Sequence, residues 1–133
     1  MKIAYLIDTD WVIDHLNKID KVTQKLKELR PAGIALSVIS LAELYEGVYY
    51  SKDPATSQKV LSTLLRDFQV LGVDEEICKV FGKERGKLRQ RGKLVSDFDL
   101  LIASTCLYYN LPLLTNNRRH YEMVEGLKIL SLS

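Results

Sequence analysis

The sequence predicts an α/β domain in which a central, mainly parallel sheet is flanked by helices. Short apolar runs alternate with longer segments of helical periodicity, and parallel strands need such crossover helices between them. The chain has 133 residues, of which 47% are hydrophobic, so it can build one core of its own. We therefore expect a single domain that spans residues 1–133.

The first half of the chain begins with a strand pattern and continues with helices. The run "IAYLI" (3–7) is continuously apolar, which is typical of a strand buried on both faces. Segment 20–31 carries one apolar stripe and predicts a helix that ends at Pro31. We expect a second strand at 34–36, followed by a helix from about Val38.

The second half repeats this alternation. Asp53 as an N-cap and Pro54 at the first helical position predict the next helix. Another helix should run from the acids at 74–76 toward Gly92, because acids in its first turn and bases in its last suit the helix dipole. The helix "DLLIASTCLYYN" then leads into the strand "LPLLT", and "LKIL" (127–130) is the last predicted strand.

Composition and charge exclude several classes of protein. Lys+Arg 19 against Asp+Glu 17 leaves a net charge of +2, so a nucleic-acid role would have to come from local charge. Cys78 and Cys106 form no Cys-x-x-Cys pair, and we expect two buried, reduced thiols. The apolar run before Asp8 is too short for a signal peptide, and no stretch approaches the ~18 residues of a membrane span. We expect a cytoplasmic protein without a membrane partner.

Four carboxylates occupy positions that one edge of such a sheet would gather. Asp8 follows the first strand, Glu43 lies in the helix after the second, and Asp97 and Asp99 open the helix before "PLLT". Ligands of open α/β sheets bind at the carboxyl ends of strands, so these acids could share a cleft. Crowded carboxylates repel one another, and Mg²⁺ or Mn²⁺ accepts such hard oxygen ligands. The pattern suits metal-assisted phosphodiester hydrolysis.

Most of these acids also have a purely structural interpretation. Ser96 and Asp99 form a capping box, and Asp97 suits the first turn of a helix. Asp8 could cap the helix "TDWVIDHL". Glu43 lies in a largely apolar stretch, where an unpaired carboxylate would be costly. If the acids serve only as caps, the protein is a non-catalytic binding module.

A second enzymatic alternative rests on "LIDTDWV". This stretch is similar to the Asp-x-Asp-x-Val opening of haloacid-dehalogenase-like phosphatases, which implies Asp8 as nucleophile and Asp10 as general acid. Against this alternative, no convincing lysine follows a third strand, and the acids near Asp99 precede a helix instead of following a strand.

Other polar residues near these motifs have simpler interpretations. Apart from the phosphatase alternative, we expect Asp10 and Asp14 to be solvated helix residues and Asn116 to be a turn residue. His15 and His120 have no partner at triad spacing, so we expect both to be exposed or structural.

Four short motifs follow one another across nearly the whole chain. They are "LIDTD" around Asp8, "SLAELYEG" around Glu43, "SDFDLLIAS" around Asp99 and "LLTNN" at 113–117. Together they resemble a PIN domain, and more closely the VapC-type toxins of toxin–antitoxin pairs. The resemblance implies a metal-dependent endoribonuclease with Asp8, Glu43 and Asp99 as ligands of Mg²⁺ or Mn²⁺ and Asp97 as a supporting acid. It also implies an RNA substrate and a cognate antitoxin, and we expect a homodimer.

The last motif departs from the family pattern. The resemblance implies that Thr115 is a hydroxyl beside the acids and that Asn117 belongs to the catalytic set. Many relatives place an aspartate where Asn117 stands. The amide can orient water or a phosphate, but it brings no charge to a second metal ion, so one or two ions stay possible.

A basic segment, "KERGKLRQRGK" (83–93), leads into the acids of the next helix. A solvated helix end is the plain interpretation of such a run. A basic surface beside an acidic cleft would also offset the repulsion of phosphates and guide a single strand inward. Three of its bases recur every four residues and would share a helical stripe. We expect RNA contacts from four residues, namely Lys83, Lys87, Arg89 and Arg91.

Overall fold

The protein is described by a computed structural model that covers residues 2–132. Met1 and Ser133, the two ends of the expected domain, lie outside the described residues. Within them, five parallel strands form one sheet in the order β3-β2-β1-β4-β5. The strands are β1 (Tyr5–Ile7), β2 (Ile34–Ser37), β3 (Gln69–Leu71), β4 (Leu113–Leu114) and β5 (Ile129–Leu130). The predicted α/β class and parallel sheet are confirmed.

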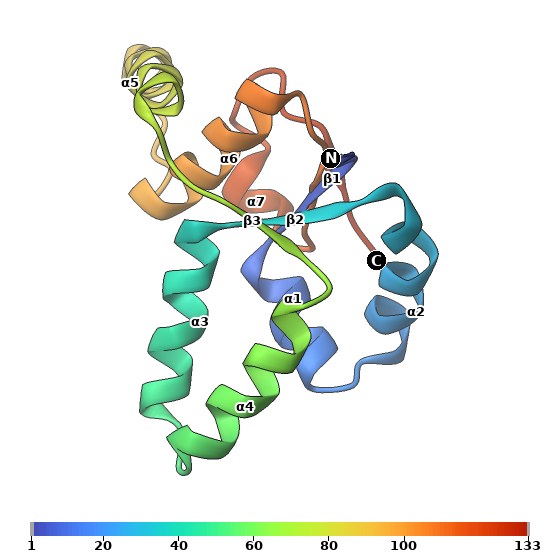
Figure 1. Cartoon of the computed structure of the whole chain (residues 1–133). Helices are drawn as coiled ribbons and strands as arrows, with labels where there is room; N and C mark the ends of the chain where they lie inside the picture. The colour runs from blue at the N-terminus through green and yellow to red at the C-terminus, as the bar shows by residue number, and fades with distance from the viewer. Residues whose placement is uncertain (1, 133) are drawn as a thin grey trace.

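Helices connect these strands (Figure 1). A 3-10 turn, η1 (Arg30–Ala32), precedes β2. The α-helices within residues 2–132 are α1 (Thr9–Leu16), α2 (Asp20–Leu29), α3 (Val38–Tyr50), α4 (Pro54–Leu65), α5 (Glu75–Gln90), α6 (Asp97–Tyr109) and α7 (Arg118–Tyr121). None of these helices is long and apolar enough to cross a membrane.

Neighbouring residues of the central strands pack on opposite faces of the sheet. Leu6 and Leu113 belong to the core under α5, α6 and α7, whereas Ile7 and Leu114 belong to the core under α1 to α4. Because both faces are covered, the strands are continuous apolar runs instead of alternating ones. The result is a three-layered arrangement with one core on each side of the sheet (Figure 1).

The carboxyl ends of β1 and β4 adjoin at the centre of the sheet. Ile7 pairs with Leu36 of β2 on one side and with Leu114 of β4 on the other. The strand order therefore changes direction at β1, which is where open α/β sheets form ligand crevices. Asp8 and Thr115 directly follow these two strands, as the sequence predicted.

The predicted element starts are largely confirmed, but the terminal strands are shorter than expected. Within the two predicted terminal strands, only Tyr5–Ile7 and Ile129–Leu130 have strand conformation. Helix α3 begins at Val38, and Asp53 caps α4 by accepting from the Thr56 amide at 3.3 Å. Cys106 is buried, but the expectation for Cys78 was wrong. Ile77 faces the core, so the next residue of the helix points to solvent.

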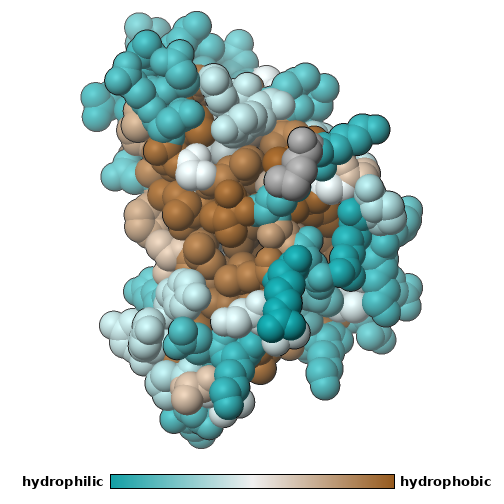
Figure 2. All heavy atoms as spheres, in the orientation of Figure 1, coloured by the Kyte–Doolittle hydropathy of each residue, from teal (hydrophilic) through white to brown (hydrophobic). Residues whose placement is uncertain are grey.

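One side of the molecule exposes a broad apolar surface. In the orientation of Figure 1, this surface extends between α5 and the helices below it (Figure 2). Val70 on the edge strand β3 is 43% exposed, and Val38 at the start of α3 is 37% exposed. Exposed apolar area of this kind is typical of surfaces that bind another protein.

Candidate active site

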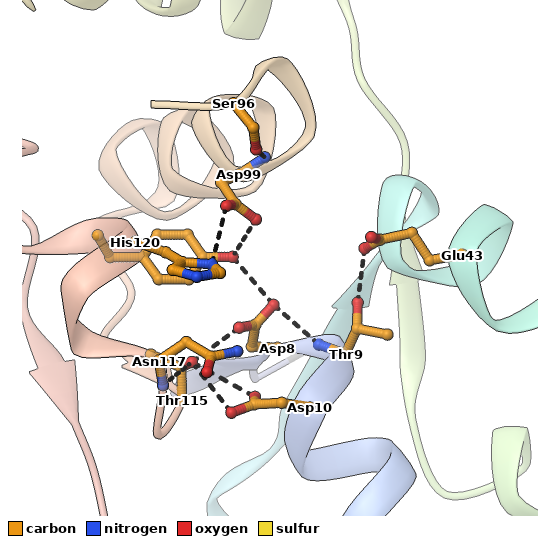
Figure 3. Close-up of polar contacts among 10 residues, drawn as sticks. Asp8, Thr9, Asp10, Glu43, Ser96, Asp99, Thr115, Asn117 and His120 are labelled. Carbon is orange, nitrogen blue, oxygen red and sulfur yellow. Dashed lines mark hydrogen bonds and ion pairs between the residues drawn. The ribbon is translucent and has the colours of Figure 1, made fainter. Parts of the chain in front are cut away.

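A cavity of about 420 Å³ opens at the carboxyl ends of the central strands. Acids from three separate segments meet there with polar side chains between them (Figure 3). The lining consists of Asp8, Thr9, Asp10, Glu43, Ser96, Asp97, Phe98, Asp99, Asn117 and His120. Five of the six predicted catalytic positions thus lie at one cavity, and the sixth, Thr115, is buried beside Asp8.

Asp8 caps α1 and belongs to the acid cluster at the same time. Its Oδ1 atom accepts from the Thr9 amide at 2.8 Å, and its Oδ2 atom accepts from the Thr115 hydroxyl at 2.7 Å. The residue is only 4% exposed. Burial raises the pKa of Asp8, the hydrogen bonds oppose that effect, and the charge of Asp99 adds to it. Capping and membership of the site are therefore compatible at this residue.

Asp99 turns its carboxylate toward the cavity instead of back to its own helix. Ser96 caps α6 by accepting from the Asp99 amide at 3.3 Å. The Asp99 Oδ1 atom lies 3.2 Å from the Tyr121 hydroxyl, and Oδ2 lies 3.2 Å from His120 Nδ1. Only the half of the capping box in which Ser96 accepts is formed, so the Asp99 carboxylate is available for other contacts.

Glu43 reaches the cavity from the second turn of α3. Its Oε1 atom accepts from the Thr9 hydroxyl at 2.8 Å, so the helices that follow β1 and β2 are joined at the site. Burial raises the pKa of Glu43, and the negative charges of Asp8 and Asp99 add to the effect. An unpaired Glu43 carboxylate would be costly in this apolar stretch, but here the carboxylate accepts from Thr9 and lines the cavity.

Asp97 lies at the rim of the cavity and differs from the other acids. Its side chain is 80% exposed and accepts from Arg85 Nη2 at 2.7 Å. Arg85 is better buried and also donates to the Val95 carbonyl at 2.8 Å. Asp97, which we predicted to be a supporting acid, is therefore paired with Arg85 at the rim and takes no part in the hydrogen bonds around Asp8.

Hydrogen bonds between nearby residues hold the polar groups of the last motif, "LLTNN" (113–117). The Asn117 amide donates to Thr115 Oγ1 at 3.0 Å, and the Asn117 side chain lines the cavity. Asn116 lies at a bend instead of the predicted turn, and its Oδ1 atom accepts from the Leu132 amide at 2.7 Å. This bend therefore anchors the carboxyl-terminal segment beside the site.

Three residues of this site were missed. Asp10 was expected to be solvated, but it accepts from the Asn116 amide at 2.9 Å, and burial together with the Asp8 charge raises its pKa to about 6. His120 is exposed as expected, yet its ring also lines the cavity. Tyr121 is fully buried, with its hydroxyl 3.0 Å from Asp8 Oδ1. Burial and the nearby carboxylates raise the pKa of Tyr121, so the hydroxyl keeps its proton.

Only the spacing of Asp10, two residues after Asp8 at a strand end, was a signal available in the sequence. His120 and Tyr121 lie on α7, a four-residue helix without a periodic pattern that predicts it.

The donor set fits a hydrated divalent ion. The single hydrogen of the Tyr121 hydroxyl serves two carboxylates, Asp8 and Asp99, so negative charge remains in excess on the cavity side. Among residues 2–132, no three His, Cys, Asp or Glu side chains are grouped closely enough to hold a metal ion by themselves. Mg²⁺ usually takes one or two carboxylates and keeps several waters, which this pair of acids suits.

The basic segment presents two different faces. On the predicted stripe, Lys87 pairs with the buried Glu84 at 3.2 Å, and Arg91 donates to the Met123 carbonyl at 3.2 Å. The other face forms a second hollow of about 360 Å³, which shares Ser96 and Asp97 with the acidic cavity. Its basic lining consists of Arg85, Arg89 and Lys93. Of the four predicted RNA contacts, Arg89 is therefore the one beside the acids.

Comparison with known proteins agrees with this architecture. The family model of the PIN domain matches residues 5–126. Ribonuclease VapC1 of Methanocaldococcus jannaschii is 36% identical over 126 residues, which cover 93% of this chain and 85% of that protein. The haloacid-dehalogenase alternative is accordingly not favoured.

Solved structures give the same result. VapBC2 from Rickettsia felis, bound to a DNA fragment from their promoter, matches with a TM-score of 0.92 and 29% identity over 98% of this chain and 100% of that one. VapBC-1 from nontypeable Haemophilus influenzae matches with a TM-score of 0.88 and 27% identity over 97% and 98% of the two chains. The chain belongs to the PIN-domain family and, within it, to the VapC ribonucleases.

Proposed function

We propose that this ribonuclease is the toxin of a VapBC-type pair and cleaves RNA at the Asp8–Asp99 site with Mg²⁺ or Mn²⁺. The observation that carries the proposal is the pair of carboxylates that share one buried hydroxyl at the cavity floor. A divalent cation would neutralise these two carboxylates, and the negatively charged phosphates of RNA would be attracted to the cation. We place the reaction in the cytoplasm, where RNA substrates occur.

Asp8 and Asp99 would hold the ion directly and Glu43 through its bound water, because no three acids of residues 2–132 are grouped closely enough to hold it by themselves. When bound, it would act as a Lewis acid toward the phosphate and lower the pKa of a water nucleophile. Thr115 holds Asp8 through Oδ2, and Thr9 holds Glu43 through Oε1, so both acids keep one orientation toward the cavity. Fixed ligands of this kind reduce the reorganisation that the reaction requires.

The remaining predicted residues would act on the substrate. The side chain of Asn117 lines the cavity, and its amide group is uncharged, which suits the orientation of a phosphate or a water molecule. Asp97 would support the site from the rim, where Arg85 holds it. Arg89 would guide RNA toward the acids, because its hollow adjoins theirs. Lys83 and Lys87 on α5, and Arg91 directly after it, would add a more distant attraction.

The decisive experiment is cleavage of a mixed RNA substrate by purified protein. We expect cleavage with added Mg²⁺ or Mn²⁺, no cleavage with EDTA, and at least about a hundredfold slower cleavage by Asp99→Asn. The backbone amide of residue 99 still donates to Ser96 Oγ in this variant, so the fold should survive. Glu28→Gln, at an exposed acid on α2, is the control and should cleave normally. Full activity of the Asp99 variant or in EDTA would refute the proposed site.

We also propose a cognate antitoxin as partner, because the similar solved structures are of VapBC proteins. A basic side chain of that partner would pair with the acids and exclude the ion, and such desolvated pairs couple strongly. Co-expression with the product of an adjacent small gene should yield a complex that does not cleave RNA. Free toxin activity in the presence of excess partner would contradict this pairing.

The apolar surface of Figure 2 supports a homodimer. Strand β3 is an edge of the sheet, and Val70 on it is 43% exposed. Burial of this surface against a second copy would remove apolar area from water. We expect Val70→Lys to lower the molecular mass measured by light scattering from that of a dimer to that of a monomer. A monomeric wild-type protein would refute the homodimer.

A further inference from the structure

The buried Tyr121 hydroxyl lies between acids that are far apart in the sequence. It is 3.0 Å from Asp8 Oδ1 and 3.2 Å from Asp99 Oδ1. The ring is 0% exposed and belongs to the same buried cluster as Leu6 of β1 and Leu100 of α6, which lie two residues before Asp8 and one residue after Asp99. Packing therefore fixes the ring, and the fixed ring determines where the hydroxyl lies.

The residue before it reaches the same acid from the cavity. His120 Nδ1 lies 3.2 Å from Asp99 Oδ2, so neighbouring side chains of α7 contact both oxygens of Asp99. The His120 side chain is 55% exposed, whereas Tyr121 approaches from within the core. The buried contact is the one that solvent cannot replace.

We propose that Tyr121 is a positioning residue that sets the relative placement of Asp8 and Asp99, an inference that rests on the proposed metal-dependent function. The hydroxyl holds the two carboxylates from beneath and leaves their cavity side open. Partners of this kind, behind the ligands of a metal, typically change metal affinity by 10–100-fold when they are removed.

Tyr121→Phe removes the hydroxyl without removing the ring. We expect Mn²⁺ binding, measured by calorimetry on RNA-free protein, to weaken by about tenfold in this variant. Tyr5→Phe is the matched control, because Tyr5 is half-buried at the start of β1, away from the strand end that carries Asp8, and it should bind Mn²⁺ as the wild type does. Equal or tighter Mn²⁺ binding by Tyr121→Phe would overturn the inference.

A stability measurement without metal tests the same contact independently. In EDTA, the effects of Tyr121→Phe and Asp99→Asn on the free energy of unfolding should be non-additive, because each removes one side of the interaction. If Tyr121→Phe alone does not fold, adding Asp99→Asn should restore folding by removing one of the two charges that the hydroxyl contacts. Additive effects, or no restoration, would overturn the inference. A wild type that binds no Mn²⁺ would instead refute the proposed metal site, and the stability cycle would still decide the role of Tyr121.

Discussion

The Thr9 hydroxyl donates to Glu43 Oε1 at 2.8 Å and thereby joins the first turn of α1 to the second turn of α3. This bond crosses 34 residues of sequence. Without it, Glu43 would have no fixed orientation toward the acids that follow β1. The two residues should therefore act together in cleavage.

We expect Thr9→Val to slow RNA cleavage by about tenfold, an effect of the size found for partners that orient metal ligands. Glu43→Gln should slow it further, and the double variant should be no slower than Glu43→Gln. Single-turnover rates at saturating Mg²⁺ would measure these effects. Thr63→Val, at an exposed threonine of α4, is the control. Additive losses would show that Thr9 does not act through Glu43.

The two faces of the basic segment should contribute differently to RNA binding. Arg89 and Lys93 adjoin the acidic cavity, whereas Lys83 and Lys87 lie on the other stripe. In an Asp99→Asn background, Arg89→Ala with Lys93→Ala should make the log–log salt dependence of RNA affinity shallower by about 0.7 for each phosphate that the protein no longer neutralises. The matched pair Lys83→Ala with Lys87→Ala should change it less. If Lys83→Ala with Lys87→Ala changes the salt dependence more, RNA binds on the predicted stripe of Lys83, Lys87 and Arg91 instead.

The metal-free protein should become more stable as its acids take up protons. The pKa of Asp10 is raised from 3.8 to about 6 by burial and by the Asp8 charge. Since the folded chain binds this proton more tightly than the unfolded chain, the stabilising contribution is complete below 3.8 and is lost as the pH rises through about 6. The burial that raises the pKa values of Asp8 and Glu43 acts in the same direction.

Asp10→Asn should therefore help the metal-free fold more at neutral than at acidic pH. Denaturant unfolding in EDTA at about pH 4.5 and about pH 7.5 would measure the free-energy difference between variant and wild type. Asp53→Asn is a useful contrast, because hydrogen bonds from Thr56 lower its pKa below 3.8, so the carboxyl is largely ionised in both states at these two pH values and the free-energy difference should change little between them. A difference for Asp10→Asn that is larger at the acidic pH would contradict the prediction.

Two glycine substitutions should have opposite effects on stability. Gly33 has φ +96°, and a Cβ atom there would lie 2.1 Å from the Lys2 carbonyl oxygen. We expect Gly33→Ala to lower the free energy of unfolding by about 2 kcal/mol or more. Gly47 lies inside α3, and an added Cβ would meet no atom within 4 Å apart from the neighbouring backbone of its own helix, so Gly47→Ala should raise the free energy of unfolding by up to about 1 kcal/mol. Thermal unfolding of the two variants would measure both effects, and a stable Gly33→Ala protein would contradict the first.

The sequence by itself determined the features that depend on neighbouring residues. The runs that become β1 and β2 are apolar because both faces of the sheet are covered, and Ser96 and Asp53 cap the helices that follow them in the chain. The strand ends of a parallel sheet meet at one edge, so Asp8 and Thr115 could be placed together from their positions alone.

Only the tertiary structure decided which groups contact these acids. Tyr121 reaches Asp8 across 113 residues, and Asn116 reaches Asp10 across 106. Helix α7 has four residues, too few for a hydrophobic period to mark it, and the packing of its tyrosine against β1 and α6 places the hydroxyl between the acids. Arg85 likewise meets Asp97 only because α5 packs against the start of α6. Long-range packing of side chains, which no local pattern records, completed the site.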